Sequence, residues 1–161
     1  MLAGGVLLHL AFGCFYLIGN ISEYVASYLH RYDESISLSS MTILLPIMVI
    51  LWSTFMFVGP FLIARLKIWQ LISIAGTIVC VGTIASSFVH TLWLFILTFC
   101  LGFGMGIGLA YMVPILCGWD WFPNNKGMVS GVVLTGFGLG TFVFSYIAIE
   151  IVNPEDESPN L

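Results

Sequence analysis

Long apolar runs alternate with short polar segments along the chain. Four stretches contain no charged residue: 1–22, 35–64, 68–119 and 127–149. A bilayer core about 30 Å thick is crossed by about 20 apolar residues in a helix, so the third stretch is too long for one crossing. A polar patch near its middle, Ser86–Thr91, divides that stretch in two. The pattern therefore predicts five transmembrane helices.

The fold class expected from this pattern is an all-α integral membrane protein. A transmembrane β-barrel needs alternating apolar and polar positions, and these runs are continuously apolar. A soluble helix needs a polar face, which these runs lack. Tryptophans near the expected span ends, where indole rings favour the membrane interface, support the boundaries: Trp69, Trp93, Trp119 and Trp121. The expected spans are about 2–28, 41–64, 69–89, 92–117 and 127–151, giving one transmembrane bundle over 1–152 and an acidic polar tail over 153–161.

The charge pattern excludes one function class and suggests an orientation. Only 7% of the 161 residues are charged and 60% are hydrophobic, whereas soluble domains carry about a quarter charged residues. The four cations, Arg31, Arg65, Lys67 and Lys126, are too few and too scattered for a nucleic-acid surface. Three of them lie on one side of the expected membrane, which the positive-inside rule assigns to the cytoplasm together with the amino terminus. The rule does not choose the membrane.

No residue pattern points to a metal, a cofactor or an enzyme. The cysteines Cys14, Cys80, Cys100 and Cys117 fall in or beside apolar runs without CxxC spacing or nearby histidine ligands. We interpret them as small apolar side chains. No nucleophile, base and acid have credible spacing for catalysis, so we expect neither an enzyme nor a bound cofactor.

Polar residues along one face of the first span are the candidate substrate contacts. The spacings of Tyr16, Asn20, Glu23 and Tyr24 place them on one helical face. Such a stripe usually faces a bundle interior or an aqueous cavity, because lipid exposure is costly. For Glu23, near the span end, interfacial water is an equal alternative. For His9, in mid-span, we favour a neutral imidazole that is hydrogen-bonded within the bundle over a proton relay.

Glycines at four-residue spacing mark close helix contacts in the fourth and fifth spans. Such small-xxx-small pairs let two backbones approach each other. Structural packing is favoured over a moving, gating contact, because the motif alone reports no motion. A dinucleotide loop is excluded because the glycines lie inside apolar runs. The pairs are Gly102 with Gly106, Gly104 with Gly108, Gly127 with Gly131, and Gly136 with Gly140.

A polar hinge joins the fourth and fifth spans. Its sequence runs from Trp119 through Asp120, Trp121, Phe122 and Pro123 to Lys126 and Gly127. Proline and the two asparagines stop one helix, and the aromatic residues anchor at the interface. Asp120 could pair with Lys126, which would contribute under about 1 kcal/mol if exposed.

These segments resemble the major facilitator superfamily, in the branch of oxalate/formate antiporters and monocarboxylate transporters. The first helix of that branch is similar to Tyr16-Leu-Ile-Gly19-Asn20-Ile-Ser22-Glu-Tyr24. The junction of its fourth and fifth helices is similar to Trp121-Phe122-Pro123, Lys126-Gly127, Gly131 and Gly136-Phe-Gly138-Leu-Gly140. The resemblance covers nearly the whole chain but only the opening part of a twelve-helix fold.

The resemblance implies alternating access, with the first and fourth helices lining a central cavity. Tyr16, Asn20 and Tyr111 are then the cavity candidates, beside Tyr24 from the polar stripe. The fifth-span glycines, including Gly138, would pack against the opposite bundle. The family's Gly-x-x-x-Asp-Arg-x-Gly loop is replaced here by a segment that keeps Gly59 and the basic Arg65 and Lys67 without the acidic residue.

Two main functions stay open at this level. The first is a fragment of a carrier for a small organic solute, with a monocarboxylate as the analogue. The second is a non-transporting structural subunit derived from a truncated carrier, and a small channel or homo-oligomeric carrier has less support. The expected partners are the lipid bilayer, the solute, and either missing carboxy-terminal helices or another subunit.

Overall fold

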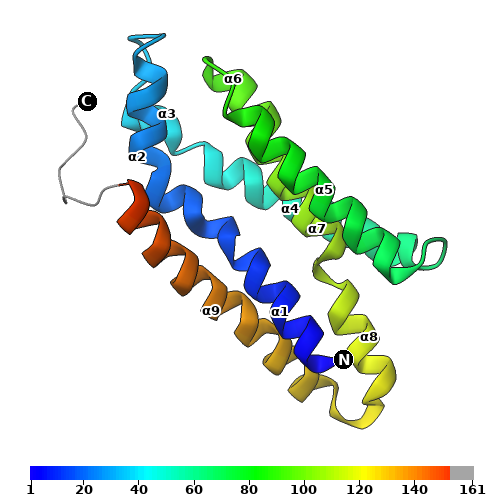
Figure 1. Ribbon diagram of the computed structural model, residues 1–161. Helices are drawn as coiled ribbons and strands as arrows, with labels where there is room; N and C mark the ends of the chain where they lie inside the picture. Colours follow the sequence, from blue (N-terminus) through cyan, green and yellow to red (C-terminus); the bar gives the residue numbers. More distant parts are fainter. Residues whose placement is uncertain (153–161) are drawn as a thin grey trace.

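The protein, described here from a computed structural model over residues 1–152, is a bundle of five long apolar helices (Figure 1). These 152 residues contain no β-strand, which confirms the all-α membrane fold class. The acidic tail expected over 153–161 lies outside the described residues. The five spans are Leu2–His30, Leu38–Ile63, Ile68–Ser86, Leu92–Trp121 and Pro123–Val152.

The first span is not one continuous α-helix. It consists of α1 (Leu2–Phe12), a 3₁₀ turn η1 (Gly13–Tyr16) and α2 (Leu17–His30). No proline occurs in this span, so the tighter turn has its cause in packing against the rest of the bundle. The span reaches His30 rather than the expected position near 28.

The second and third spans begin at side chains that satisfy free backbone groups. Ser37 caps α3 (Leu38–Met41), and its N–H donates to Ser40 Oγ at 3.3 Å. The second span then continues in α4 (Leu44–Ile63), so it starts earlier than the expected position 41. The Lys67 N–H donates to the Gln70 side chain at 3.0 Å where α5 (Ile68–Ser86) begins. Because the first-turn N–H groups of a helix lack internal partners, these bonds fix both starts.

The fourth span changes its helical form twice. It contains α6 (Leu92–Phe95), a π-helical segment η2 (Ile96–Cys100), α7 (Leu101–Tyr111) and α8 (Val113–Trp121). The break at Met112 precedes Pro114, which lacks the N–H that would continue the ladder. The span extends beyond the expected end at 117, up to Trp121.

The fifth span begins at Pro123. A short 3₁₀ turn η3 (Pro123–Asn125) leads into α9 (Lys126–Val152). The hinge between the fourth and fifth spans is therefore reduced to Phe122, the only residue there that lies outside both spans.

The helices form two tightly packed units. One unit, the α1–α9 pair, joins the first and fifth spans, and the other, the α4–α5–α7 layer, places the fourth span between the second and third. Figure 1 shows the pair and the layer as separate groups, with α8 at one end. Contacts between α1 and α7 are sparse, whereas α8 contacts both α1 and α9. The fold is thus two units that meet along a seam.

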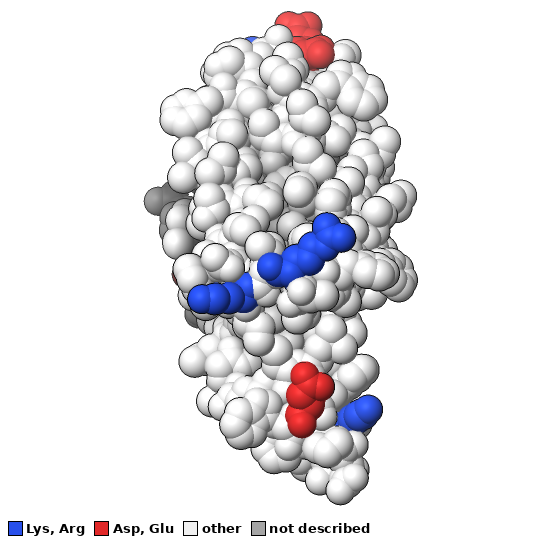
Figure 2. Space-filling view, turned by 90° about the vertical axis from the view of Figure 1, so that its right-hand side faces the viewer, with Lys and Arg blue, Asp and Glu red and all other residues white. Residues whose placement is uncertain are grey.

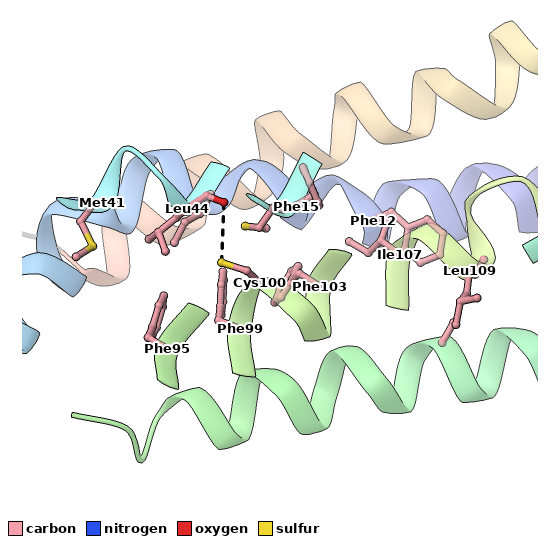
Figure 3. Close-up of a cluster of buried hydrophobic side chains, with 14 of the residues drawn as sticks. Phe12, Phe15, Met41, Leu44, Phe95, Phe99, Cys100, Phe103, Ile107 and Leu109 are labelled. Carbon is pink, nitrogen blue, oxygen red and sulfur yellow. Dashed lines mark hydrogen bonds between the residues drawn. The ribbon is translucent and has the colours of Figure 1, made fainter. Parts of the chain in front are cut away.

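An aromatic ladder fills the core of the layer near the π-helical segment. Figure 3 shows Phe95, Phe99 and Phe103 in a row. The Phe95 and Phe99 rings are stacked with 5.1 Å between their centroids, and the Phe99 and Phe103 rings are tilted with 4.6 Å between theirs. The Cys100 thiol lies 3.9 Å from the Leu44 carbonyl oxygen. Aromatic pairs of this kind stabilise a core beyond the area that they bury.

The outer surface is almost free of charge. The face in Figure 2 shows acidic side chains at the top, cations near the middle, acidic and basic side chains again nearer the bottom, and an uncharged surface elsewhere. Large apolar side chains such as Phe57, Phe61 and Phe142 are more than two-thirds exposed. This exposure suits lipid, where an apolar surface has no cost.

Candidate functional site

Aromatic side chains from four spans meet at the seam between the two units. Phe137 of α9 lies at their centre, with its ring centroid 5.9 Å from that of Tyr16, 5.8 Å from Tyr111 and 6.5 Å from Trp52. His9 of α1 packs 4.9 Å from Tyr111 and 6.4 Å from Phe137. We call these five residues, His9, Tyr16, Trp52, Tyr111 and Phe137, the seam cluster.

Both tyrosines of the seam cluster lie at a break in their helix. Tyr16 is the last residue of η1, and Tyr111 is the last residue of α7. Broken helices in membrane bundles free backbone groups where the protein lines a cavity or a site, and they mark substrate sites in many carriers. Their coincidence with the aromatic residues makes this position the candidate functional site.

The break in the first span depends on a close approach to α9. A Cβ atom at Gly13 would collide with the backbone of Gly140 and Thr141. The Thr141 hydroxyl donates to the Gly13 carbonyl oxygen at 3.2 Å and also contacts the Phe137 carbonyl oxygen at 3.0 Å. This bond joins the turn η1 to α9 across the helix pair.

Two side chains of the seam cluster carry buried polar atoms without a well-formed hydrogen bond among the described residues. His9 is fully buried, and neither its Nδ1 nor its Nε2 atom is paired. The Trp52 Nε1 atom is also buried and unpaired. The hydrogen bond that we expected for His9 is not formed with good geometry: its polar neighbour is the Gly5 backbone one turn earlier in α1, and the rings of Phe12, Tyr111 and Phe137 surround it. Buried polar groups are normally paired, so these exceptions require an explanation.

The predicted polar stripe of the first span separates into two places. Tyr16 lies in the seam cluster and is 39% exposed, and Asn20 follows it one turn later as an exposed residue. Tyr24 instead lines a depression with Ser86 and Phe95, from the third and fourth spans. Tyr16 and Tyr111 thus come together through Phe137, whereas Tyr24 lies away from them.

The fourth-span glycines pack on both sides of α7. A Cβ atom at Gly104 would lie 2.5 Å from Leu51 Cβ, and one at Gly108 would lie 2.7 Å from the Trp52 carbonyl oxygen, both in α4. On the opposite side, a Cβ atom at Gly102 would lie 2.9 Å from Gly82 Cα of α5. Gly106 similarly faces Val79 and the Ala75 carbonyl oxygen. Only hydrogen fits at these contacts, because they are closer than real Cβ atoms approach.

The fifth-span glycines divide into contacting and open positions. Added Cβ atoms at Gly136 and Gly140 would collide with the carbonyl oxygens of Val6 and Leu10 in α1. Gly127, Gly131 and Gly138 have nothing within 4 Å. The predicted Gly127–Gly131 contact is therefore not present among the described residues, and these glycines face outward from the bundle.

The loop residues serve local packing. An added Cβ atom at Gly59 would collide with the Leu109 carbonyl oxygen, so this glycine belongs to the α4–α7 contact. Trp119 Nε1 donates to the Lys126 carbonyl oxygen at 3.1 Å and to Ser130 Oγ at 2.9 Å, which ties the hinge to α9. Lys126 Nζ lies 5.8 Å from the centroid of the Trp119 ring.

The remaining loop residues are at the bundle surface. Arg65 and Lys67 are exposed between α4 and α5. Trp121 is 73% and Phe122 37% exposed, and Pro123 starts the last span.

Trp52 and Phe137 were absent from our sequence-based candidates. One signal could have found Trp52, because the other four tryptophans lie near expected span ends, where indole rings favour the interface. A tryptophan in mid-span must place its N–H inside the membrane. Phe137 is one of thirteen phenylalanines and carries no comparable signal.

Several known proteins are similar to parts of the chain. Apicoplast pyruvate carrier 1 of Toxoplasma gondii is 44% identical over 71 residues, which is 44% of this chain and 13% of that protein. Human monocarboxylate transporter 14 is 27% identical over 93 residues, covering 56% of the chain and 18% of the relative. The oxalate:formate antiporter of Oxalobacter formigenes is 31% identical over 52 residues, covering 32% of the chain and 12% of the relative.

The matches cover only a small part of each relative, between 12% and 18% of its length. No family model matches the chain. No solved structure matches it. The relatives are transporters rather than enzymes. Together with the five membrane helices, these matches show a membrane protein that is similar, over part of its length, to monocarboxylate transporters and to an oxalate:formate antiporter.

Proposed function

We propose that the chain is the amino-terminal part of a carrier that moves a small organic solute across a membrane, with monocarboxylates as the first class to test. The observation that carries this proposal is the seam cluster, where aromatic residues from four spans meet at the breaks of two helices. The names of the relatives, a pyruvate carrier and monocarboxylate transporters among them, support the solute class.

The proposed mechanism is alternating access, in which helices move as packed groups around the solute. Glycine contacts hold α9 on α1, and they hold α4 and α5 on α7. The seam between these units has bulky side chains rather than backbone contacts. Bulky rings can change rotamer where interlocked backbones cannot slide, so the seam is the natural place for movement.

The proposed orientation places the amino terminus on the cytosolic side or its organellar equivalent. Arg65, Lys67 and Lys126 are connected to the ends of spans on that side, and Arg31 lies at the opposite end of the first span. Cations near span ends remain preferentially on the cytosolic side during insertion. Cysteine labelling of intact vesicles at Lys67→Cys and Asp33→Cys would report the two sides.

The first experiment is to sequence the transcript across the codon for Leu161. A frame that continues into about seven further apolar spans supports the carrier, because carriers are built from repeated helix bundles. A stop codon at this point supports the structural-subunit alternative, which stable co-purification with other membrane subunits would then test.

The second experiment is solute uptake by the complete gene product in proteoliposomes. Uptake of labelled pyruvate, lactate or oxalate is expected, and Phe137→Ala should reduce it at least about tenfold, because displaced site geometry is costly in rate. Phe142→Ala is the matched control, since Phe142 is in the same helix and is 73% exposed. Absence of uptake for every solute, or equal uptake by both variants, would contradict the proposed site.

A further inference from the structure

We propose that His9 and Trp52 form a hydrogen-bonding subsite for the carboxyl group of a small organic acid. The inference rests on the proposed carrier function and goes beyond it by naming the polar contacts. Sequence comparison does not assign these two residues a role, and neither lies on the polar stripe of the first span. The subsite rests on buried nitrogen atoms of two side chains in the same cluster, the His9 ring nitrogens and Trp52 Nε1, which form no hydrogen bond of good geometry with the described residues.

The two side chains belong to different units and share two aromatic neighbours. His9 belongs to the α1–α9 pair, and Trp52 belongs to α4 in the layer. Both pack on Tyr111, with ring centroids 4.9 Å and 5.1 Å away, and both pack on Phe137, at 6.4 Å and 6.5 Å. A ligand held between His9 and Trp52 would therefore bridge the seam.

Their chemistry selects the ligand. An indole N–H only donates, whereas a neutral imidazole offers one donor and one acceptor. A carboxyl that carries its proton complements this set, because its carbonyl oxygen accepts from Trp52 and its hydroxyl donates to His9. A bare carboxylate fits poorly, since no lysine or arginine lies within the first 30 residues or in 38–63 to neutralise it.

The side chains of the seam cluster close over this subsite. Phe137 is partly buried and packs on both polar rings, so it must turn aside to admit a solute. Leaving two buried polar groups unpaired destabilises the closed arrangement. A bound carboxyl would remove that cost, and a site of this kind gains affinity because its polar groups are otherwise unsatisfied.

The test uses two variants and a direct probe of the indole. In the full chain in lipid nanodiscs, ¹⁵N-labelled tryptophan gives an Nε1–H signal for Trp52, which is identified by its loss in Trp52→Phe. Titration with propionic acid at pH 5 should shift this signal downfield and saturably, whereas 1-propanol should not. His9→Leu should weaken the propionic acid titration about 5-fold to 10-fold, the value of one lost hydrogen bond.

Trp93→Phe is the matched control, because Trp93 is 75% exposed and has no role in the seam cluster. Circular dichroism confirms that each variant is helical, and Trp52→Phe retains an aromatic ring, so loss of folding can be separated from loss of binding. The inference is overturned if the Trp52 signal does not shift, or if His9→Leu titrates like the wild type.

Uptake measurements separate this inference from the carrier proposal. If the complete gene product transports acids and both variants transport them as well as the wild type does, the subsite proposal is wrong and the carrier proposal is supported. If no acid is transported but the Trp52 signal shifts as expected, the subsite proposal is supported and the carrier proposal is wrong.

Discussion

The contacts within the two helix units differ in kind from the contacts between them. Within the units, glycines let backbones touch, as Gly140 does at Leu10 and Gly108 at Trp52. Between the units, large rings meet around Phe137. A backbone contact tolerates no added atom, whereas a ring contact can be rearranged by side-chain rotation. The difference teaches where this bundle is fixed and where it can open.

The hydrogen bonding of polar groups also differs between the interior of the units and the seam. Within the α1–α9 pair, the Gly13 carbonyl oxygen accepts a hydrogen bond from the Thr141 hydroxyl. At the seam, the His9 ring nitrogens and the Trp52 Nε1 atom are buried without a well-formed hydrogen bond among the described residues. Unpaired polar groups are retained where function uses them, because stability alone would select apolar side chains.

The largest expected effect comes from breaking a backbone contact. Gly140→Ala places a methyl group against the Leu10 carbonyl oxygen and should lower the free energy of unfolding by about 3 kcal/mol, the upper part of the usual overpacking range. Gly138→Ala is the matched control, because nothing lies within 4 Å of an added Cβ atom. Thermal unfolding in detergent would measure both, and similar values for the two variants would contradict the assignment of Gly140 to the contact.

A change at the seam should have the opposite sign. His9→Leu removes an unpaired imidazole from the bundle interior and should raise the free energy of unfolding by about 1–2 kcal/mol. The same variant should bind propionic acid more weakly, which separates stability from function. Denaturant titration in mixed micelles would measure the gain, and a clear loss of stability would show that His9 is paired after all.

A smaller effect is expected at the bond that supports the break in the first span. Thr141→Val keeps the side-chain shape but removes the hydroxyl that donates to the Gly13 carbonyl oxygen from the neighbouring helix. Interhelical bonds of this kind contribute about 0.6 kcal/mol on average in membrane proteins. Thr135→Val is the control, because Thr135 donates only to Gly131 within its own helix. Equal stabilities for the two variants would show that the Thr141–Gly13 hydrogen bond does not stabilise the break in the first span.

The smallest effect lies outside the membrane, in the connection between the first two spans. The Ser35 hydroxyl, 2.6 Å from Asp33 Oδ1, and the Ser35 N–H, 3.0 Å away, hold the pKa of this carboxyl below its usual value of 3.8. Because the folded pKa is lowered, the stabilisation is present above pH 3.8 and is lost as the pH falls through the folded pKa. Ser35→Ala should return the pKa toward 3.8 in a ¹³C NMR titration. An unchanged pKa would show that Ser35 has no part in the shift.

The sequence predicted the elements of this fold better than their contacts. Apolar length alone fixed the number of helices, because each crossing needs about the same number of residues. Ends differed by a few residues, as at Trp121, since polar residues at the interface can remain helical. The 3₁₀ turn at Gly13 had no sequence signal, because it follows from contact with α9 rather than from a proline.

The site could be predicted only in part. Tyr16 and Tyr111 were selected, and the structure brings both to Phe137. Trp52 faces these residues because of the orientation of α4 about its own axis. The nearly uniform apolar sequence of α4 does not predict that orientation. The same reason explains the glycines, since spacing alone could not tell that Gly136 touches α1 and Gly131 does not.

The distance along the chain between α1 and α9 has a consequence for biosynthesis. Roughly 110 residues separate the end of α1 at Phe12 from the start of α9 at Lys126, and a ribosome adds about 5–20 residues per second. The first helix therefore waits on the order of 5–20 s for the partner that fits its backbone. During this interval the His9 ring lacks the packing that α9 supplies through Phe137.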